Sequence, residues 1–181
     1  VESEDACDCY ITTNMRVIVE NNLFECLKYI CEPTEHHEKR ITARFTCDMG
    51  VGRELTRHRT LSFAQESTRY CNYSKNKFGE ELTFVIPTWL DRLRPDDAYG
   101  ISQVGNGYDP RYIFVHTCNF IEEKYMKLIE LGHKPQEARQ ILPLGLKTEI
   151  VVTGFESDWE HFFSLRSPKY GAQGVHPDMA K

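Results

Sequence analysis

Residues 56–70 read Thr-Arg-His-Arg-Thr-Leu-Ser-Phe-Ala-Gln-Glu-Ser-Thr-Arg-Tyr, and this stretch is the most informative part of the chain. Three cationic or titratable side chains stand in a row at Arg57, His58 and Arg59. Hydroxyl, amide and guanidinium groups follow within ten positions, at Ser62, Gln65, Ser67 and Arg69. A hydrophobic core does not require so many groups that bind phosphates and carbonyls. The stretch therefore indicates a site for an anionic, nucleotide-like ligand.

The length of 181 residues fits one domain, residues 1–181, with a sizeable core. Apolar residues make up 40% and aromatic residues 12% of the chain, which excludes the disordered class. No apolar run approaches the roughly 18 to 20 residues of a membrane span, and the acidic N-terminus lacks a signal-peptide pattern. We therefore expect a cytoplasmic protein with no membrane partner. Because the chain begins with valine, we expect trimmed termini.

The seven cysteines are an odd number and lack the paired spacing of a zinc site. We interpret them as reduced thiols, and we expect Cys26 and Cys31 to be small core residues of a helix. His36 and His37, between two glutamates, suggest a metal site at first sight. Adjacent side chains diverge in regular structure, so one ion would not take both, and no metal is expected.

The charge is unevenly distributed along the chain. The net charge is −5, yet residues 53–77 hold six Lys or Arg against two acids. A short basic segment in an acidic protein favours the binding of a small, multiply charged ligand over the binding of an extended nucleic acid.

The pattern of apolar residues predicts an α+β fold, in which a mixed or antiparallel sheet is flanked by helices. Strands are expected at residues 15–20, 41–47, 82–86 and 148–153. Helices are expected at residues 23–31, 49–58, 111–131, 136–142 and 158–165. Loops are expected at residues 60–80 and 96–110. The long central helix carries one apolar stripe, which we assign to core packing, and Gly132 caps it: Phe114, Cys118, Ile121, Tyr125, Leu128 and Leu131.

The helix at residues 49–58 would deliver the Arg-His-Arg triplet at its C-terminal end. Consecutive helical residues are about 100° apart around the axis, so the three side chains cannot all face one ligand. They would fan out towards two ligands, or towards a ligand and a neighbouring subunit. Taken alone, the triplet is typical of a solvated cationic surface.

The arrangement of Arg-His-Arg, seven further residues and Ser67, then Arg69 and Tyr70, resembles the signature of the flavin-dependent thymidylate synthases. Two further segments are similar to segments of that family, namely residues 137–144 (Glu-Ala-Arg-Gln-Ile-Leu-Pro-Leu) and residues 153–166, which end in an arginine. The resemblance covers roughly residues 15 to 170.

The resemblance implies an enzyme that converts deoxyuridylate (dUMP) to thymidylate (dTMP). Methylenetetrahydrofolate would supply the carbon, and a reduced nicotinamide would supply a hydride through FAD, with NADPH the expected donor and NADH left open. The family uses no cysteine nucleophile, so none of the seven cysteines need be catalytic. The family also implies a homotetramer whose active sites draw on several subunits.

The resemblance assigns site residues by position. The FAD-binding residues would be Thr34, His37, Arg57, His58, Arg59, Thr60 and His161. The dUMP-binding residues would be Glu54, Arg57, Gln65, Ser67, Arg69, Arg139 and Arg166. Two of them would be catalytic: Arg139 would stabilise negative charge on the activated uracil, and Ser67 would act by hydrogen bonding, since no base is evident beside it.

The chain departs from the family pattern at four of its positions. His37 and Gln65 stand where many relatives have Glu, and Phe155 and Ser157 stand where many have Asn and Arg. These departures leave the adenine and pyrophosphate contacts of FAD open.

Two other readings remain. Residues 53–78 interleave charged and aromatic side chains in the way that single-strand nucleic-acid binders do, although the net charge and the short patch argue against a nucleic-acid partner. Alternatively, Arg57 and Arg59 would form ion pairs between subunits of a purely structural oligomer.

Overall fold

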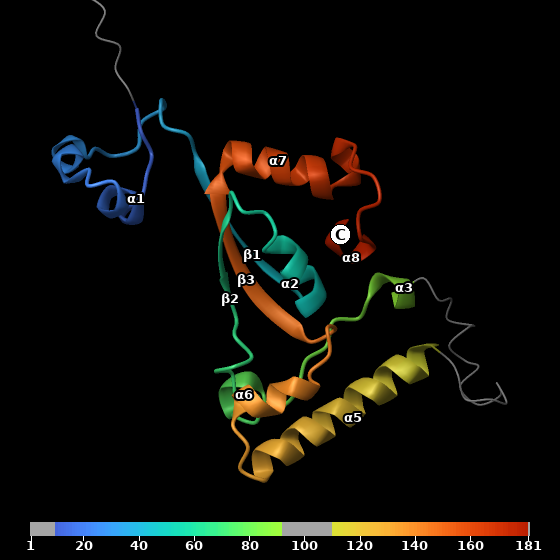
Figure 1. Cartoon of the computed structure of the whole chain (residues 1–181). Coiled ribbons are helices and arrows are strands. Elements are labelled where there is room, and N and C mark those ends of the chain that lie inside the picture. Colours follow the sequence, from blue (N-terminus) through green and yellow to red (C-terminus); the bar gives the residue numbers. More distant parts are fainter. Residues whose placement is uncertain (1–9, 92–109, 181) are drawn as a thin grey trace, which may run out of the picture.

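The structure is a computed structural model, and it describes residues 10–91 and 110–180. Its centre is a sheet of three strands, β1 (Arg40–Asp48), β2 (Ser62–Gln65) and β3 (Lys147–Phe155). The strand order is β1-β3-β2, and both pairs are antiparallel (Figure 1). Together with its helices, this sheet confirms the predicted α+β fold.

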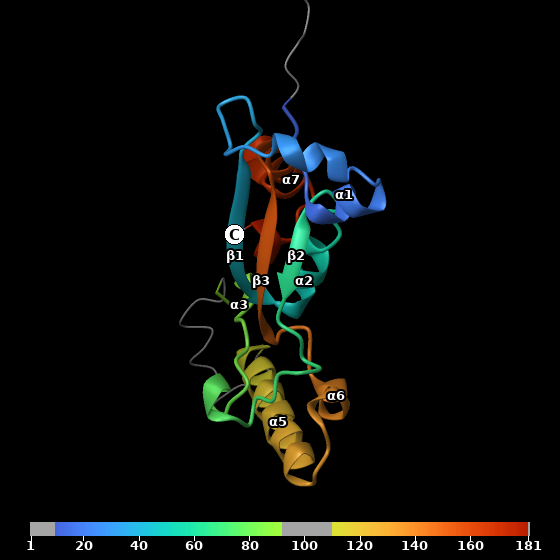
Figure 2. The same cartoon turned by 90° about the vertical axis from the view of Figure 1, so that its left-hand side faces the viewer.

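One face of the sheet is covered by two helices, α2 (Met49–Leu55) and α7 (Glu156–Arg166). Because strand side chains alternate between faces, Ile150 and Val152 of β3 share this face and are fully buried. Both helices add to the same core, which contains Val51, Leu55, Leu61, Ile150, Val152, Trp159 and Phe162. Figures 1 and 2 show α2 and α7 on the same side of the sheet.

A second core lies at one end of the sheet, around the long helix α5 (Pro110–Glu130). It contains Tyr73, Leu82, Tyr125, Ala138 and Leu146. The short helix α6 (Pro135–Ala138) and the 3-10 helix η4 (Arg139–Ile141) pack beside α5 (Figure 2). Cys118 and Tyr125 of the predicted stripe are buried, whereas Leu131 is 65% exposed and does not belong to it.

Gly132 ends α5 as expected. Its φ of 91° lies in the left-handed region that glycine adopts without strain. The N–H of Gly132 donates to the carbonyl of Ile129, and the N–H of His133 donates to that of Leu128. These bonds satisfy carbonyls that the helix end leaves free, so the chain turns sharply into α6.

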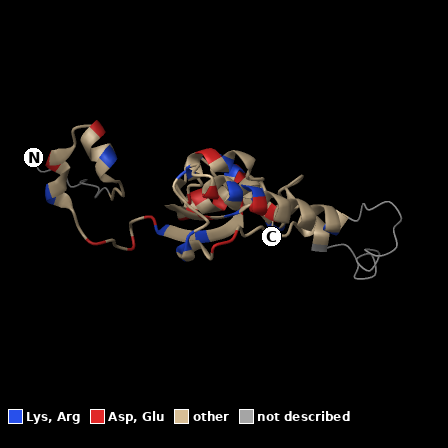
Figure 3. Ribbon diagram, turned by 90° about the horizontal axis from the view of Figure 1, so that it is seen from below, with Lys and Arg blue, Asp and Glu red and all other residues tan. Residues whose placement is uncertain are grey.

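The remaining helices among the described residues are short. They are α1 (Met15–Glu20), α3 (Thr88–Asp91), α8 (Pro177–Ala180) and the 3-10 helices η1 (Phe24–Tyr29), η2 (Asn76–Phe78) and η5 (Pro168–Tyr170). Figures 1 and 3 show the N-terminal helices apart from the body that the sheet and its helices form. No helix among residues 10–91 and 110–180 is long and apolar enough to cross a membrane.

The prediction of a strand at residues 15–20 is wrong, because these residues form α1. The side chain of Asn14 accepts a hydrogen bond from the N–H of Val17 and caps the helix, and Arg16 pairs with Glu20 one turn later. Local capping and an i,i+4 pair thus outweigh the alternation of apolar residues. No described strand pairs with this segment.

Other boundaries also differ from the prediction. Residues 60–80 are not all loop, since they contain the edge strand β2, and residues 82–86 form only an isolated bridge between Phe84 and Leu146. The segment 23–31 contains a 3-10 helix, and 136–142 is divided between α6 and η4. The predictions at 41–47, 111–131, 148–153 and 158–165 are confirmed within a few residues. Residues 96–109 of the predicted loop lie outside the described residues.

Candidate active site

The Arg-His-Arg triplet lies in a turn and not in the helix that precedes it. Helix α2 begins where the side chain of Asp48 accepts a hydrogen bond from the N–H of Val51, and it ends at Leu55. The N–H of Arg57 then donates to the carbonyl of Glu54, and the N–H of His58 donates to that of Leu55. The predicted helix 49–58 is therefore three residues too long.

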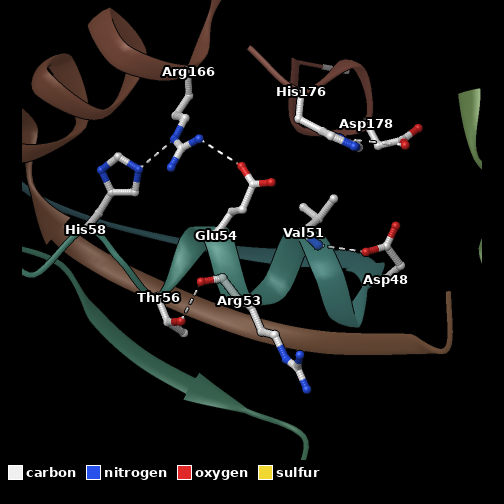
Figure 4. A network of polar contacts seen from close by, with 9 residues as sticks. All are labelled: Asp48, Val51, Arg53, Glu54, Thr56, His58, Arg166, His176 and Asp178. Atoms are coloured by element: carbon white, nitrogen blue, oxygen red, sulfur yellow. Dashed lines mark hydrogen bonds and ion pairs between the residues drawn. The ribbon is translucent and has the colours of Figure 1, made fainter. Parts of the chain in front are cut away.

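The best-defined contact of the site joins this turn to α7. The Nε–H of Arg166 donates to Nε2 of His58 at 2.9 Å, and Nη1 of the same guanidinium donates to Oε2 of Glu54 at 2.8 Å. Figure 4 shows Arg166 between the two acceptors. The arginine and the glutamate are both partly buried, so this is not a freely solvated surface pair.

The contact with Arg166 fixes the protonation of His58. Since Nε2 accepts a hydrogen bond, the ring is neutral and carries its proton on Nδ1. Burial lowers the pKa of His58 below 6.5, and the nearby charges of Arg166 and then His161 lower it further. The ring edge packs on Phe162, with 4.8 Å between the centroids. His58 is therefore a positioned, neutral imidazole at pH 7.

The neighbours of His58 are solvent-facing. Arg57, Arg59 and Thr60 are exposed. Neither guanidinium has a hydrogen-bond or ion-pair partner among residues 10–91 and 110–180. Two unpaired cations on either side of a fixed imidazole leave this turn able to bind a polyanion such as a pyrophosphate.

A second group of candidate residues lies around the end of β2. The Gln65 amide donates to the Thr148 hydroxyl at 3.3 Å, and a Cβ on Gly52 would lie only 2.8 Å from the Gln65 nitrogen. Gly52 therefore leaves the space that Gln65 occupies. Ser67 is exposed, and among the described residues its hydroxyl has one hydrogen bond, accepted from the N–H of Arg69 at 3.4 Å. No base lies against it in the described chain.

Arg69 connects this group to α6. Its Nε donates to the side chain of Gln136 at 3.4 Å, and its guanidinium lies 5.2 Å from the ring centroid of Tyr70. Arg139 immediately follows α6, is exposed, and has no side-chain partner among the described residues. Both arginines therefore belong to the same end of the molecule, and Arg139 is free to meet a ligand.

Thr34 and His37 form a third group, a turn of their own. The N–H of Thr34 donates to Nδ1 of His37 at 3.0 Å, and the Thr34 hydroxyl lies 2.9 Å from the same nitrogen. Because Nδ1 accepts, the neutral His37 ring carries its proton on Nε2, which remains available as a donor.

The structure thus brings the predicted site residues together in three groups. Arg166 contacts both Glu54 and His58, and His161 lies five residues before Arg166 on α7. Figures 1 and 2 place α7 and α6 at opposite ends of the sheet, so His161 and Arg166 belong to one end and Arg139 to the other. In the described chain no hydrogen bond or ion pair connects one group with another.

Several partners were not recognised from the sequence. Thr148 could have been found, since the alternation of β3 places it on the same face as Ile150. Gln136 as the partner of Arg69 has no sequence signal, because the two residues are 67 positions apart. The same holds for Glu38, whose carboxylate contacts Ser157 over 119 positions.

The cysteines within the described residues are free thiols. Cys26 and Cys31 are exposed, so the prediction that they are core residues is wrong. Burial, and then Asp48, raises the pKa of Cys47 to about 11, and burial also raises the pKa values of Cys71 and Cys118. None of these three is an activated thiolate. The described residues contain no cluster of three or more metal-ligating side chains.

A family model described as "Thymidylate synthase complementing protein" matches residues 21–181. The chain is 28% identical to the probable flavin-dependent thymidylate synthase of Paramecium bursaria Chlorella virus 1 over 162 residues, which cover 85% of this chain and 70% of that protein. It is 30% identical over 149 residues to the flavin-dependent thymidylate synthase of Pyrococcus furiosus, and this match covers 82% of this chain and 54% of that protein. It is 32% identical over 134 residues to the flavin-dependent thymidylate synthase of Haloarcula marismortui, and this match covers 67% of this chain and 51% of that protein. Apart from the viral relative, the chain spans about half the length of these relatives.

Proposed function

Since the chain belongs to the thymidylate synthase complementing protein family, we propose that it is a flavin-dependent thymidylate synthase, which methylates dUMP to dTMP. Methylenetetrahydrofolate would be the carbon donor, and NADPH the source of the hydride. The observation that carries the proposal is the turn after α2. There Arg166 holds a neutral His58, and the arginines on either side of His58 have no side-chain partner in the described chain. The whole chain would form one catalytic domain.

The residues present fit FAD. Its pyrophosphate needs cationic, bidentate donors, and Arg57 and Arg59 are exposed and unpaired in the described chain. His58 would offer its Nδ1–H, and His37 its Nε2–H, to acceptor atoms of the cofactor, with Thr34, Thr60 and His161 as further contacts. When bound, FAD would pass a hydride from the nicotinamide to the methylene group on the pyrimidine.

Apart from Glu54, whose carboxylate is paired with Arg166, the remaining candidate residues fit dUMP. Arg57, Arg69 and Arg166 would bind its phosphate and carbonyl oxygens. Gln65, held by Thr148, would present an amide to the pyrimidine, and the exposed Ser67 hydroxyl would donate a hydrogen bond. Arg139 would stabilise the negative charge that develops on the uracil when its C5 becomes nucleophilic, and it has no partner in the described chain to neutralise it.

We also propose that more than one copy of the chain builds each site, in a homotetramer. The separation of the candidate residues supports this, because the arginine that ends α7 and the arginine that follows α6 belong to opposite ends of the sheet. Exposed apolar side chains on α5 are candidates for the contacts between subunits: Tyr112, Ile113, Val115 and Phe120.

Nucleic-acid binding by residues 53–78 is not favoured. Tyr73, one of its aromatic residues, is only 6% exposed and packs against Phe78 and Tyr125, so its ring is not available to stack on bases. The family match covers this segment, and we propose a flavin and nucleotide site there instead.

The proposed function is tested by incubating the purified protein with FAD, NADPH, methylenetetrahydrofolate and dUMP, and measuring dTMP. We expect dTMP that depends on every component. Absence of product from a protein that binds both FAD and dUMP would contradict the proposed reaction.

A further inference from the structure

The chain segment that precedes β1 is hydrogen-bonded to the first turn of α7. The backbone N–H of Ser157 donates to Oε1 of Glu38 at 2.9 Å, and the Ser157 hydroxyl donates to the same oxygen. The N–H of Glu156 donates to the carbonyl of Lys39 at 3.0 Å. The two bonds of Glu38 join residues 119 positions apart. The bonds to Glu38 and Lys39 satisfy N–H groups that the start of an eleven-residue helix leaves free.

The contact is charged as well as hydrogen-bonded. The Glu38 carboxylate lies at the N-terminal end of α7, where the helix dipole favours a negative charge. The helix does not depend on Glu38 alone for its first turn, because Asp158 accepts a hydrogen bond from the N–H of Phe155 at 3.0 Å. Glu38 therefore does more than cap the helix, because it also connects two segments that are distant in the sequence.

On the N-terminal side of this connection lies the Thr34–His37 turn, which its own hydrogen bonds close. Residues 31–37 make no hydrogen bond to any described residue beyond position 40. On the other side, α7 carries His161 and Arg166. Because β1 pairs with β3 only from Arg40 onward, the bonds of Glu38 and Lys39 to the start of α7 are the described hydrogen bonds to that helix that lie nearest the turn.

We propose that Glu38 is a positioning residue for the flavin, which fixes the Thr34–His37 turn against α7 so that His37 and His161 meet one bound cofactor. The proposal rests on the proposed function. Ser157, one of the departures from the family pattern, supplies the hydroxyl partner of Glu38. Glu38 does not contact the cofactor itself, and its effect is to keep the turn from moving away.

The test is the dissociation constant of FAD, measured by the quenching of its fluorescence, for the full chain and four variants. Glu38→Ala removes the side-chain bonds of the connection, Glu38→Gln keeps an acceptor oxygen without the charge, and Ser157→Ala removes only the hydroxyl. Asp158→Ala is the matched control, because it removes a cap from the same helix without touching the turn. Glu35→Gln controls for the loss of an exposed charge within the turn itself.

We expect Glu38→Ala to weaken FAD binding about tenfold, the size of one lost charge-assisted hydrogen bond. Glu38→Gln and Ser157→Ala should give smaller losses, and Glu35→Gln none. Asp158→Ala should lower the melting temperature about as much as Glu38→Ala, yet leave the FAD affinity close to that of the wild type.

Two results would overturn the proposal while leaving the proposed function intact. One is wild-type FAD affinity in folded Glu38→Ala, and the other is an equal loss of affinity in Asp158→Ala, which would reduce Glu38 to a helix cap. If Glu38→Ala does not fold, wild-type affinity in both Glu38→Gln and Ser157→Ala is the contrary result. A wild-type chain that binds no FAD would instead overturn the proposed function, and this proposal with it.

Discussion

Arg166, near the end of the chain, donates a hydrogen bond of 2.9 Å to the central histidine of the Arg-His-Arg triplet, His58. The bond crosses 108 positions of sequence and joins the last turn of α7 to the turn after α2. It requires an unprotonated Nε2 on His58, so protonation of the ring would replace an attraction by a repulsion between two cations. The geometry of the triplet therefore depends on pH.

The stability of the protein should fall as the pH falls below 6.5. The pKa of His58 is lowered in the folded state, so the unfolded chain binds more protons over the interval between the folded value and 6.5. The contribution of His58 to the free energy of unfolding is complete above pH 6.5, and it is lost as the pH falls through the lowered pKa. Melting temperatures from about pH 8 to about pH 5 measure it. His58→Gln, which keeps an acceptor for Arg166, should flatten this part of the profile, and an unchanged profile would contradict the assignment.

Glu54→Gln should strengthen the binding of dUMP. In the structure the Glu54 carboxylate is bonded to Nη1 of the Arg166 guanidinium, and it would compete with a nucleotide phosphate for that nitrogen. Removing the charge while keeping the shape should lower the dissociation constant by roughly threefold to tenfold, as expected for a partly buried charge interaction. Titration calorimetry measures it. Weaker binding would show instead that Glu54 itself contacts the nucleotide.

Arg139→Ala should lower the turnover of dUMP by about a hundredfold or more, the usual cost of losing a donor to a developing negative charge. FAD should remain bound and the fold intact, because the Arg139 side chain has no partner in the described chain. Steady-state kinetics with a flavin spectrum of each variant separate the two effects. Arg53→Ala, another exposed arginine, is the control. Normal turnover of Arg139→Ala would remove this arginine from the mechanism.

Ser67→Ala should retain measurable activity. The hydroxyl is exposed and lies against the N–H of Arg69 and not against a base, so we assign it a hydrogen bond to substrate and not a covalent attack. Loss of one hydrogen bond corresponds to roughly a tenfold fall in kcat/KM. A variant that binds dUMP normally and yet is wholly inactive would reopen the covalent role.

The parts of the fold that the sequence predicts correctly have long and regular patterns. Strands β1 and β3 alternate over nine residues each, and α5 keeps its apolar stripe over several turns. Strand β2 has only four residues and forms by pairing with β3, so its own sequence carries almost no signal. Residues 15–20 show the reverse case, in which a clear alternation yields to the Asn14 cap.

The candidate site divides in a similar way. The residue types around Arg57 to Arg69 suggest an anionic ligand, and the family resemblance assigns a role to each of them. The contacts that set their chemistry are not accessible from spacing, because Glu54 and His58 meet Arg166 over 112 and 108 positions. The neutral state of His58 follows from that packing and not from the motif.

A titration tests whether FAD and dUMP share one site around the Arg-His-Arg turn. The purified protein is loaded with FAD, and dUMP is added while the visible absorbance spectrum of the flavin is recorded. We expect bound FAD whose absorbance bands shift in a saturable way as dUMP is added. A protein that takes up no FAD, or whose flavin spectrum is unchanged at saturating dUMP, would contradict it.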